Sequence, residues 1–243
     1  SVGEPLARPS KTANPLVVDL GYGASAVTPV ELIERLRKVR PEATLVGFEI
    51  DPERVTSARA ELPALKQHGR DTAGVTFERG GFETPLPAEI AQTADVIRAF
   101  NVLRQYDEAD VAEAWQLMCA RLQPEGVLIE GTCDEIGRVS TWIALTPDGP
   151  QTLTISLRLA DLESPSIAAE RLPKALIHRN VPGERVHEFF VDLDRWWNTH
   201  ASLSSFSAAQ RWVATVASMK DSGWPVRDGR SIWRLGEITV DWS

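Results

Sequence analysis

Short apolar runs alternate with amphipathic stretches along the first half of the chain. Five of these runs are too short for a helix and are followed by polar residues or glycine, which is typical of buried strands. Between them, apolar residues recur at three- and four-residue steps, for example at Val30, Ile33 and Leu36, and this spacing predicts helices that pack on a sheet. Strands that alternate with helices predict a parallel sheet. The strands are expected at residues 16–20, 44–49, 75–79, 94–100 and 127–132.

Capping signals mark where the first helices begin. Thr28 and Glu31 have the spacing of a capping box, and Pro29 suits the first turn of the helix that follows. Asp51 precedes a proline and predicts the N-cap of the second helix. The sequence Pro-Glu-Gly at residues 124–126 predicts a turn just before the fifth strand.

The pattern changes after residue 140. Two strand-like runs, 140–145 and 153–159, flank the turn sequence Thr-Pro-Asp-Gly-Pro and predict an antiparallel hairpin. Farther on, two stripes at helical spacing and one alternating run predict two helices and a terminal strand. The first stripe is Val186, Phe189, Phe190, Leu193 and Trp197, the second is Ala209, Trp212, Val213 and Val216, and the alternating run is Ile238, Val240 and Trp242.

Composition narrows the class of protein. The chain has 243 residues, of which 43% are hydrophobic and 25% charged, as in ordinary globular proteins. Its net charge of −8 disfavours a nucleic-acid substrate held on a broad basic face. No apolar run reaches the ~18 residues of a membrane span, and no signal peptide opens the sequence. Two cysteines, Cys119 and Cys133, favour a reducing cytoplasm, and the four histidines lack metal-ligand spacing, so no metal site is predicted.

The stretch from Asp19 to Ser25 carries the chemistry. It reads Asp-Leu-Gly-Tyr-Gly-Ala-Ser and joins the first strand to the first helix, where Gly21 and Gly23 permit a sharp turn and the close approach of a ligand. It resembles the first motif of the class I S-adenosylmethionine (SAM)-dependent methyltransferases, an acidic residue followed by Gly-x-Gly-x-Gly, with Ser25 in place of the third glycine. The competing nicotinamide-binding turn has Gly-x-Gly-x-x-Gly, but here Ala26 takes its last position.

The resemblance implies a fold and a cofactor. The expected fold is α/β, with a Rossmann-like, mostly parallel seven-stranded sheet, a closing antiparallel hairpin and a helical C-terminal extension. We expect an N-terminal arm over 1–13, a SAM-binding core over 14–160 and an extension over 161–243 packed on the core. The residues expected to bind SAM are Asp19, Gly21, Tyr22, Gly23, Ala24, Ser25, Glu49, Ile50, Gly81, Phe82 and Asn101.

Three of these positions have roles that the resemblance defines. Glu49 ends the second strand, where the family places an acid that accepts hydrogen bonds from the ribose hydroxyls. Asp19 corresponds to the acid that orients the glycine loop and, often through water, the amino-acid end of the cofactor. The family often has Gly-Asp after the third strand, but this chain has Gly81 and Phe82, which leaves the adenine contact to backbone amides and to the Phe82 ring. Core packing is an equal alternative for Phe82.

Four residues are candidates for catalysis: Asn101, Tyr106, Asp134 and His178. Asn101 and Tyr106 lie in a stretch that resembles Arg-Asn-Val-Leu-x-Tyr of the chemotaxis-receptor methyltransferases, after the fourth strand. Asp134 follows the fifth strand and is a candidate base for the acceptor, with helix capping as its alternative role. His178 belongs to segment 170–200, which we expect to wall the acceptor side.

Three functions are compatible with these residues. The first is transfer of a methyl group from SAM to a small-molecule or protein acceptor, mainly by alignment of the reactants. The second is SAM binding without transfer, as in a sensor or an assembly partner. The third, a nicotinamide-dependent oxidoreductase, is disfavoured by Asp19 and by the closing hairpin. Neither the acceptor nor the oligomeric state follows from the sequence.

Overall fold

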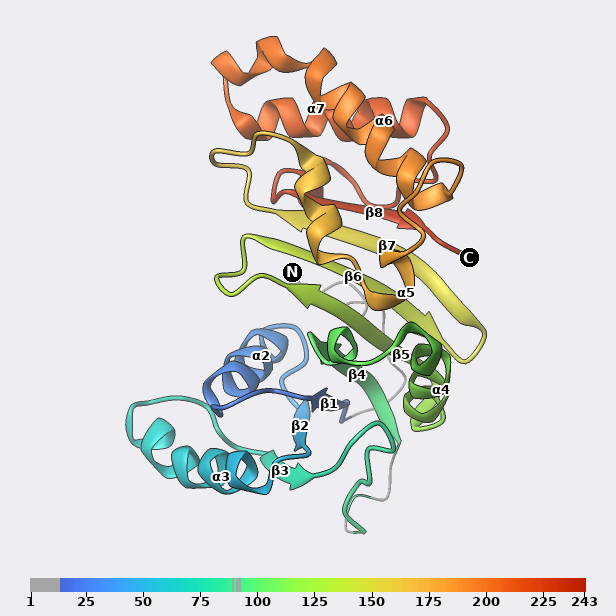
Figure 1. Ribbon diagram of the computed structural model, residues 1–243. Helices are drawn as coiled ribbons and strands as arrows, with labels where there is room; N and C mark the ends of the chain where they lie inside the picture. The colour runs from blue at the N-terminus through green and yellow to red at the C-terminus, as the bar shows by residue number, and fades with distance from the viewer. Residues whose placement is uncertain (1–13, 89, 91–92) are drawn as a thin grey trace. The chain divides into compact units, whose positions relative to one another are not determined.

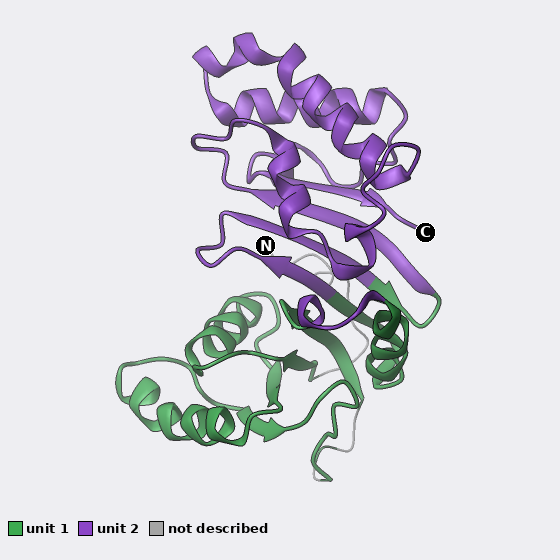
Figure 2. Ribbon diagram, viewed as in Figure 1, with its two compact units in different colours: residues 1–102, 109–129, 145–148 green, residues 103–108, 130–144, 149–243 purple. Residues whose placement is uncertain are grey.

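The computed structural model describes residues 14–88, 90 and 93–243 and divides into two compact units (Figure 2). Unit 1 comprises residues 1–102, 109–129 and 145–148, and unit 2 comprises residues 103–108, 130–144 and 149–243. The expected N-terminal arm over 1–13 lies outside the described residues. The expected boundaries of the core and the extension stay predictions.

Unit 1 holds the parallel strands of the first half of the chain (Figure 1). β1 (Leu16–Leu20), β2 (Thr44–Glu49), β3 (Val75–Arg79) and β4 (Ala94–Phe100) have the bounds expected from the sequence. β1 pairs in parallel with β2 and β4, and β2 pairs in parallel with β3. All five residues of β1 are buried, which explains why apolar and polar residues do not alternate in it; four of the five are apolar and the other is Asp19.

The helices of the first half of the chain have the bounds and the capping described below. α2 (Val27–Arg37) buries Val30, Ile33 and Leu36, as the spacing predicts. α3 (Pro52–Gln67) begins after Asp51, whose side chain accepts a hydrogen bond from the Glu53 amide, so the predicted cap is confirmed. The short η1 (Leu103–Gln105) and α4 (Glu108–Cys119) follow β4.

The predicted turn at 124–126 is wrong, because β5 (Leu122–Cys133) already includes these residues. The reason is the close approach of β4. A Cβ atom on Gly126 would lie only 2.9 Å from the carbonyl oxygen of Ala94, so glycine lets the two strands run together here. The Ala94 amide also donates to the carbonyl oxygen of Arg121 at 2.9 Å. Glycine in this strand therefore marks a close contact of backbones rather than a turn.

The sheet has the strand order β3-β2-β1-β4-β5-β6-β7-β8. β6 (Val139–Thr146) and β7 (Gly149–Leu157) form the expected hairpin. β8 (Glu237–Asp241) pairs antiparallel with β7, so the described residues form eight strands where seven were expected. The alternating terminal run supplies the additional strand, with Ile238 and Val240 buried.

Apart from η1, the described helices of unit 2 lie in the C-terminal half of the chain. They are η2 (Pro165–Arg171), α5 (Lys174–Ile177), α6 (Arg185–Thr199), η3 (Ala201–Ser205), α7 (Ala208–Asp221) and α8 (Arg230–Trp233). α6 buries the whole predicted stripe from Val186 to Trp197. α7 also contains the whole second stripe, as predicted, with Trp212 and Val216 buried and Ala209 and Val213 half-buried.

Tryptophans anchor this unit. The Trp197 indole donates to the carbonyl oxygen of Glu163 at 2.9 Å, and the Trp212 indole to that of Glu237 at 3.3 Å. The Arg211 guanidinium lies 3.7 Å from the centre of the Trp197 ring. Both rings are fully buried, so these tryptophans are core residues rather than ligand walls. No helix among the described segments has the length and apolar character needed to cross a membrane.

Candidate functional site

The loop between β1 and α2 has the backbone geometry of a ligand-binding turn. Gly21 has a φ of +67° and Gly23 a φ of +89°, in the left-handed region that favours glycine. A Cβ on Gly21 would lie 2.5 Å from Val102 Cγ2, whereas a Cβ on Gly23 would have no atom of the described residues within 4 Å, its two chain neighbours aside. Gly21 is therefore needed for packing against the end of β4. Gly23 leaves open space beside an exposed Ala24.

The start of α2 differs from the predicted capping box. The N-cap is Ala26 rather than Thr28, and the side chain of Ala26 cannot cap the helix. Glu61 of α3 replaces the box, because its Oε2 accepts hydrogen bonds from Ser25 Oγ and from the Ala26 amide, both at 2.8 Å. Ser25 Oγ also accepts from the Val27 amide at 3.2 Å. The serine at the third-glycine position thus ties the loop to α3.

Asp19 lies on β1 with its side chain completely buried. Arg98 Nη1, on β4, donates to Asp19 Oδ1 at 2.8 Å, and the same guanidinium lies 4.4 Å from the centre of the Phe100 ring. Burial raises the pKa of the Asp19 carboxyl above its usual range, and the charge and hydrogen bond of Arg98 oppose that rise. Asp19 Oδ2 is buried and has no hydrogen-bond partner within the described chain. One acceptor of this carboxylate is therefore available to a ligand or a water.

Glu49 stands at the carboxyl end of β2, as predicted, and is almost fully buried. Its Oε1 accepts from the Ile50 amide at 3.0 Å and faces the Asp51 amide at 3.5 Å. Its Oε2 lies 3.6 Å from Nη1 of Arg54. These contacts fix the carboxylate at the strand end, and its remaining lone pairs stay available for a diol.

The residues after β3 bring a second acid to this edge. The Gly81 amide donates to Oε1 of Glu83 at 3.1 Å, so a carboxylate stands one residue beyond Phe82, the position where the family often has its acid. Ile50 is 60% exposed, and its Cγ2 would lie 3.8 Å from a Cβ on Gly81. Phe82 is half-buried, which is compatible with both of its predicted roles, contact with the adenine and packing in the core. An exposed apolar side chain beside a backbone amide suits the face and edge of an aromatic base.

Tyr22, between the two glycines, points its side chain into the core. Its ring packs against Phe77 at 4.8 Å between centroids, and a Cβ on Gly47 would clash with both rings. Burial is the main cause that raises the pKa of Tyr22 to about 12, and the charge of Glu49 adds to it. The hydroxyl has no hydrogen-bond partner among the described residues. Any contact of Tyr22 with a cofactor would therefore come from its backbone.

Tyr22→Phe should raise the free energy of unfolding by about 1 kcal/mol at neutral pH, because it removes a buried hydroxyl that lacks a partner. Because the pKa of Tyr22 is raised in the folded state, the phenol of the unfolded chain ionises first, and the wild type loses stability as the pH rises from the ordinary pKa of 10.0 through about 12. The variant should lack that alkaline loss, which denaturant titrations between these pH values would measure. Tyr106→Phe removes the other tyrosine of the chain, and this variant should still show the alkaline loss of stability. A lower stability of Tyr22→Phe at neutral pH would contradict the prediction.

Asn101 follows β4 and has a φ of +61°, which asparagine tolerates better than most residues. Its side chain is exposed, and the next residue, Val102, contacts Gly21. Unit 1 thus brings Asn101, the glycine loop and the Asp19–Arg98 pair to one edge of its parallel strands. Ligands bind at such an edge, outside the carboxyl ends of the strands.

The other candidates for catalysis lie in unit 2. Tyr106 is half-buried just after η1. Asp134 Oδ1 accepts from the amides of Arg138 and Val139 at 2.7 and 3.2 Å, which fixes the turn between β5 and β6. The His178 side chain is 70% exposed, with Nε2 3.9 Å from Oε2 of Glu108. The roles of these three residues in catalysis stay predictions.

Two residues at the candidate site escaped the sequence reasoning. Glu61 lies in the middle of α3, where an acidic residue reads as part of a solvated face. Glu83 sits in an irregular stretch, where only its spacing from Gly81 offered a signal. Arg98 is also at this site, and its contact with Asp19 makes it the partner of a neighbouring acid.

Comparison with known proteins identifies a related family. Residues 11–172, about two thirds of the chain, match a family described as "Methyltransferase domain". A search of the curated proteins found no match.

Several solved structures are similar in part. The CMeT domain of the citrinin polyketide synthase is 15% identical, with a TM-score of 0.40, over 54% of this chain and 32% of that one. PKMT2 from Rickettsia typhi in complex with AdoHcy is 11% identical, with a TM-score of 0.37, over 51% and 22% of the two chains. The O-methyltransferase NcsB1 from neocarzinostatin biosynthesis, with S-adenosyl-L-homocysteine and 1,4-dihydroxy-2-naphthoic acid, is 18% identical, with a TM-score of 0.37, over 53% and 35%. The match thus spans about a third or less of each of these proteins.

Proposed function

Since the chain belongs to the family of methyltransferase domains, we propose that it transfers a methyl group from SAM to a small-molecule or protein acceptor. The observation that carries the proposal is the glycine loop of unit 1. Gly23 has a left-handed backbone and open space where a Cβ would stand. Next to this loop in the fold, the buried Asp19 carboxylate keeps one oxygen without a partner.

The residues of unit 1 fit the groups of SAM. Asp19 Oδ2 supplies an acceptor for the ammonium of the methionine part, directly or through water. Glu49 supplies acceptors for the two ribose hydroxyls. The Gly81 amide and the exposed Ile50 side chain suit the edge and face of the adenine. The backbone of residues 21–25 and the Asn101 side chain complete the proposed set.

When bound, SAM supplies a methyl group made electrophilic by the positive sulfonium. The chain must then hold the acceptor in line with the carbon–sulfur bond, and such alignment lowers a barrier by up to about 7–11 kcal/mol in well-oriented cases. Asn101, with its exposed amide, is proposed to orient the acceptor or the methionine end.

For an acceptor that loses a proton, three residues of unit 2 are proposed to help. His178 is the best placed by its own surroundings, because its side chain is exposed and its Nε2 lies 3.9 Å from Oε2 of Glu108. Asp134 and Tyr106 are weaker candidates, since Asp134 already accepts two backbone amides and Tyr106 is half-buried. Segment 170–200 as a wall of the acceptor site stays a prediction.

Binding of SAM without transfer is a second candidate function. It is favoured by the two backbone hydrogen bonds that engage Asp134, because a carboxylate fixed in a turn is a poor base. Formation of S-adenosylhomocysteine with a panel of small-molecule and protein acceptors would support transfer. Binding of SAM with no product from any acceptor in a cell extract would support the second function.

Glu49→Ala tests the cofactor site. The variant should bind SAM more weakly by about 1.5–3 kcal/mol, because it loses a charged hydrogen-bonding partner. Calorimetry would measure the dissociation constant, with NAD as a comparison ligand that should not bind the wild type. Glu78→Ala is a matched control, since it removes an acid of β3 that pairs with Arg59 instead. Unchanged SAM affinity in a folded Glu49→Ala variant would refute the assignment.

We also propose that the protein works in the cytoplasm. Neither Cys119 nor Cys133 forms a disulfide within the described residues, and cysteines outside disulfides are typical of a reducing compartment. Burial raises the pKa of the Cys119 thiol, which keeps this residue in its neutral form.

A further inference from the structure

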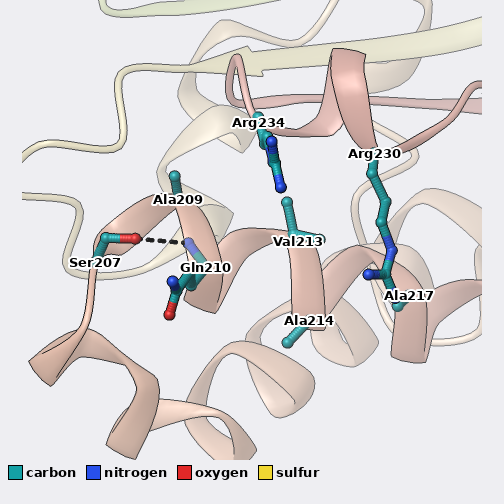
Figure 3. Close-up of a pocket in the computed structure, with 8 residues that line it drawn as sticks. All are labelled: Ser207, Ala209, Gln210, Val213, Ala214, Ala217, Arg230 and Arg234. Atoms are coloured by element: carbon teal, nitrogen blue, oxygen red, sulfur yellow. Dashed lines mark hydrogen bonds between the residues drawn. The ribbon is translucent and has the colours of Figure 1, made fainter.

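A hollow in unit 2 lies between α7 and α8, apart from every residue assigned above. It has a volume of about 480 Å³, which is in the range of small-molecule sites. Figure 3 shows the side chains of Arg230 and Arg234 extending from the α8 side towards α7. The lining residues are Ser207, Ala209, Gln210, Val213, Ala214, Ala217, Arg230 and Arg234.

The α7 side of the hollow is apolar and made of small residues. The small side chains of Ala214 and Ala217 leave the hollow unfilled, and Val213 adds an aliphatic surface. This face differs from the one that carries Trp212 and Val216 into the core. It explains why the predicted apolar stripe of α7 is only partly buried, since Ala209 and Val213 line the hollow instead of packing in the core.

The α8 side of the hollow carries positive charge. Arg230 and Arg234 are four residues apart around the short α8 and its C-cap, so they are neighbours on the surface, where like charges repel. Within the described part of the chain, neither guanidinium has a hydrogen bond or an ion pair. Arg227, close by in sequence, is instead paired with Asp241. No acidic side chain lines the hollow, although the chain has 34 acidic residues against 26 basic ones.

We propose that this hollow binds a small organic anion with a carboxylate or phosphate group and an apolar body. The two guanidinium groups would donate charge-assisted hydrogen bonds to the anionic group and so relieve their mutual repulsion. The alanine and valine surface of α7 would cover the apolar body. Ser207 and Gln210 stand at the polar end of the lining, where the Ser207 hydroxyl already accepts from the Gln210 amide. The site is independent of the proposed SAM site.

Calorimetry on the full chain tests this proposal with three probes of equal chain length: hexanoate, hexyl phosphate and hexanamide. The wild type should bind at least one of the two anions, and which one it prefers identifies the anionic group. Arg230→Gln/Arg234→Gln should bind that anion at least about tenfold more weakly, because charge-assisted hydrogen bonds are lost. Arg138→Gln/Arg158→Gln changes the charge equally with two other exposed arginines of unit 2 and should bind like the wild type.

A second variant guards against a general effect of charge. Ala214→Leu fills the hollow and leaves both arginines in place, so it should also weaken binding at least about tenfold. The proposal would be overturned if hexanamide bound as tightly as the preferred anion, or if neither anion bound the wild type. It would also be overturned if binding of the anion survived either the double arginine substitution or Ala214→Leu. Inorganic phosphate that binds as tightly as hexyl phosphate would also overturn it, because the apolar surface would then have no role.

Discussion

Gly23→Val should abolish SAM binding while the protein still folds. The φ of +89° at this position strains any residue with a Cβ, and a β-branched side chain tolerates it least. No atom lies within 4 Å of the Cβ position, so the valine side chain would enter the open space where the cofactor is proposed to lie. The dissociation constant measured by calorimetry should rise at least about a hundredfold, which corresponds to about 2.8 kcal/mol.

The chain supplies a matched control for the strain itself. Gly69, after α3, has a φ of +79° and also no neighbour within 4 Å of its Cβ position. Gly69→Val should therefore lower the stability by a similar amount, about 1–2 kcal/mol, and leave SAM binding unchanged. If both variants bound SAM like the wild type, the loop from Gly21 to Ser25 would be a structural turn only. If both variants lost SAM binding, the loss would reflect the lower stability of the folded protein.

The strands were predictable because burial and local sequence agree in them. β1 to β4 are short apolar runs followed by polar residues, and both their type and their bounds follow from this pattern. β5 shows where the reasoning fails. Pro-Glu-Gly is a turn sequence locally, but the contact of Gly126 with the backbone of Ala94 is set by a strand about thirty residues away, and no local pattern reports it.

The candidate site was predictable to a similar extent, in its local features but not in its contacts with residues distant in sequence. The positions of Asp19, Gly23 and Glu49 at the ends of β1 and β2 follow from the motif and the strand pattern. The partners of these strand ends and of the loop do not, because Arg98 reaches Asp19 from 79 residues away in sequence and Glu61 reaches Ser25 from 36 residues away. The capping box failed for this reason. A carboxylate from α3 accepts from the amide of the N-cap, Ala26, and the Ser25 hydroxyl accepts from the first amide of α2, that of Val27, so the local box at Thr28 is not needed.

Arg98→Met should destabilise the protein more than any other single change considered so far. Asp19 is fully buried, and Arg98 provides its one ion pair within the described residues. Removing one partner of a buried pair leaves an uncompensated charge, which costs about 3 kcal/mol or more. Methionine keeps much of the side-chain volume and the contact with Phe100, so the loss would reflect charge rather than a cavity.

The pH dependence of this loss distinguishes it from a packing defect. Burial already raises the pKa of the Asp19 carboxyl, and without Arg98 it should rise further. A carboxyl whose pKa is raised in the folded state contributes most stability when protonated, and that contribution disappears as the pH rises through the raised pKa. Arg98→Met should therefore be close to the wild type in acid, below the ordinary pKa of 3.8, and fall behind it as the pH increases. Denaturant titrations across that range would measure the difference.

Asp19→Asn provides the control for that prediction, because it removes the charge that Arg98 neutralises. In the double variant Asp19→Asn/Arg98→Met, the buried pair becomes two neutral side chains, and much of the lost stability at neutral pH should return. The pH-dependent difference from the wild type should vanish with it. A loss in Arg98→Met that is equal at all pH values and is not relieved by Asp19→Asn would mean that Arg98 acts through packing, and that Asp19 does not depend on it to remain charged beside the glycine loop.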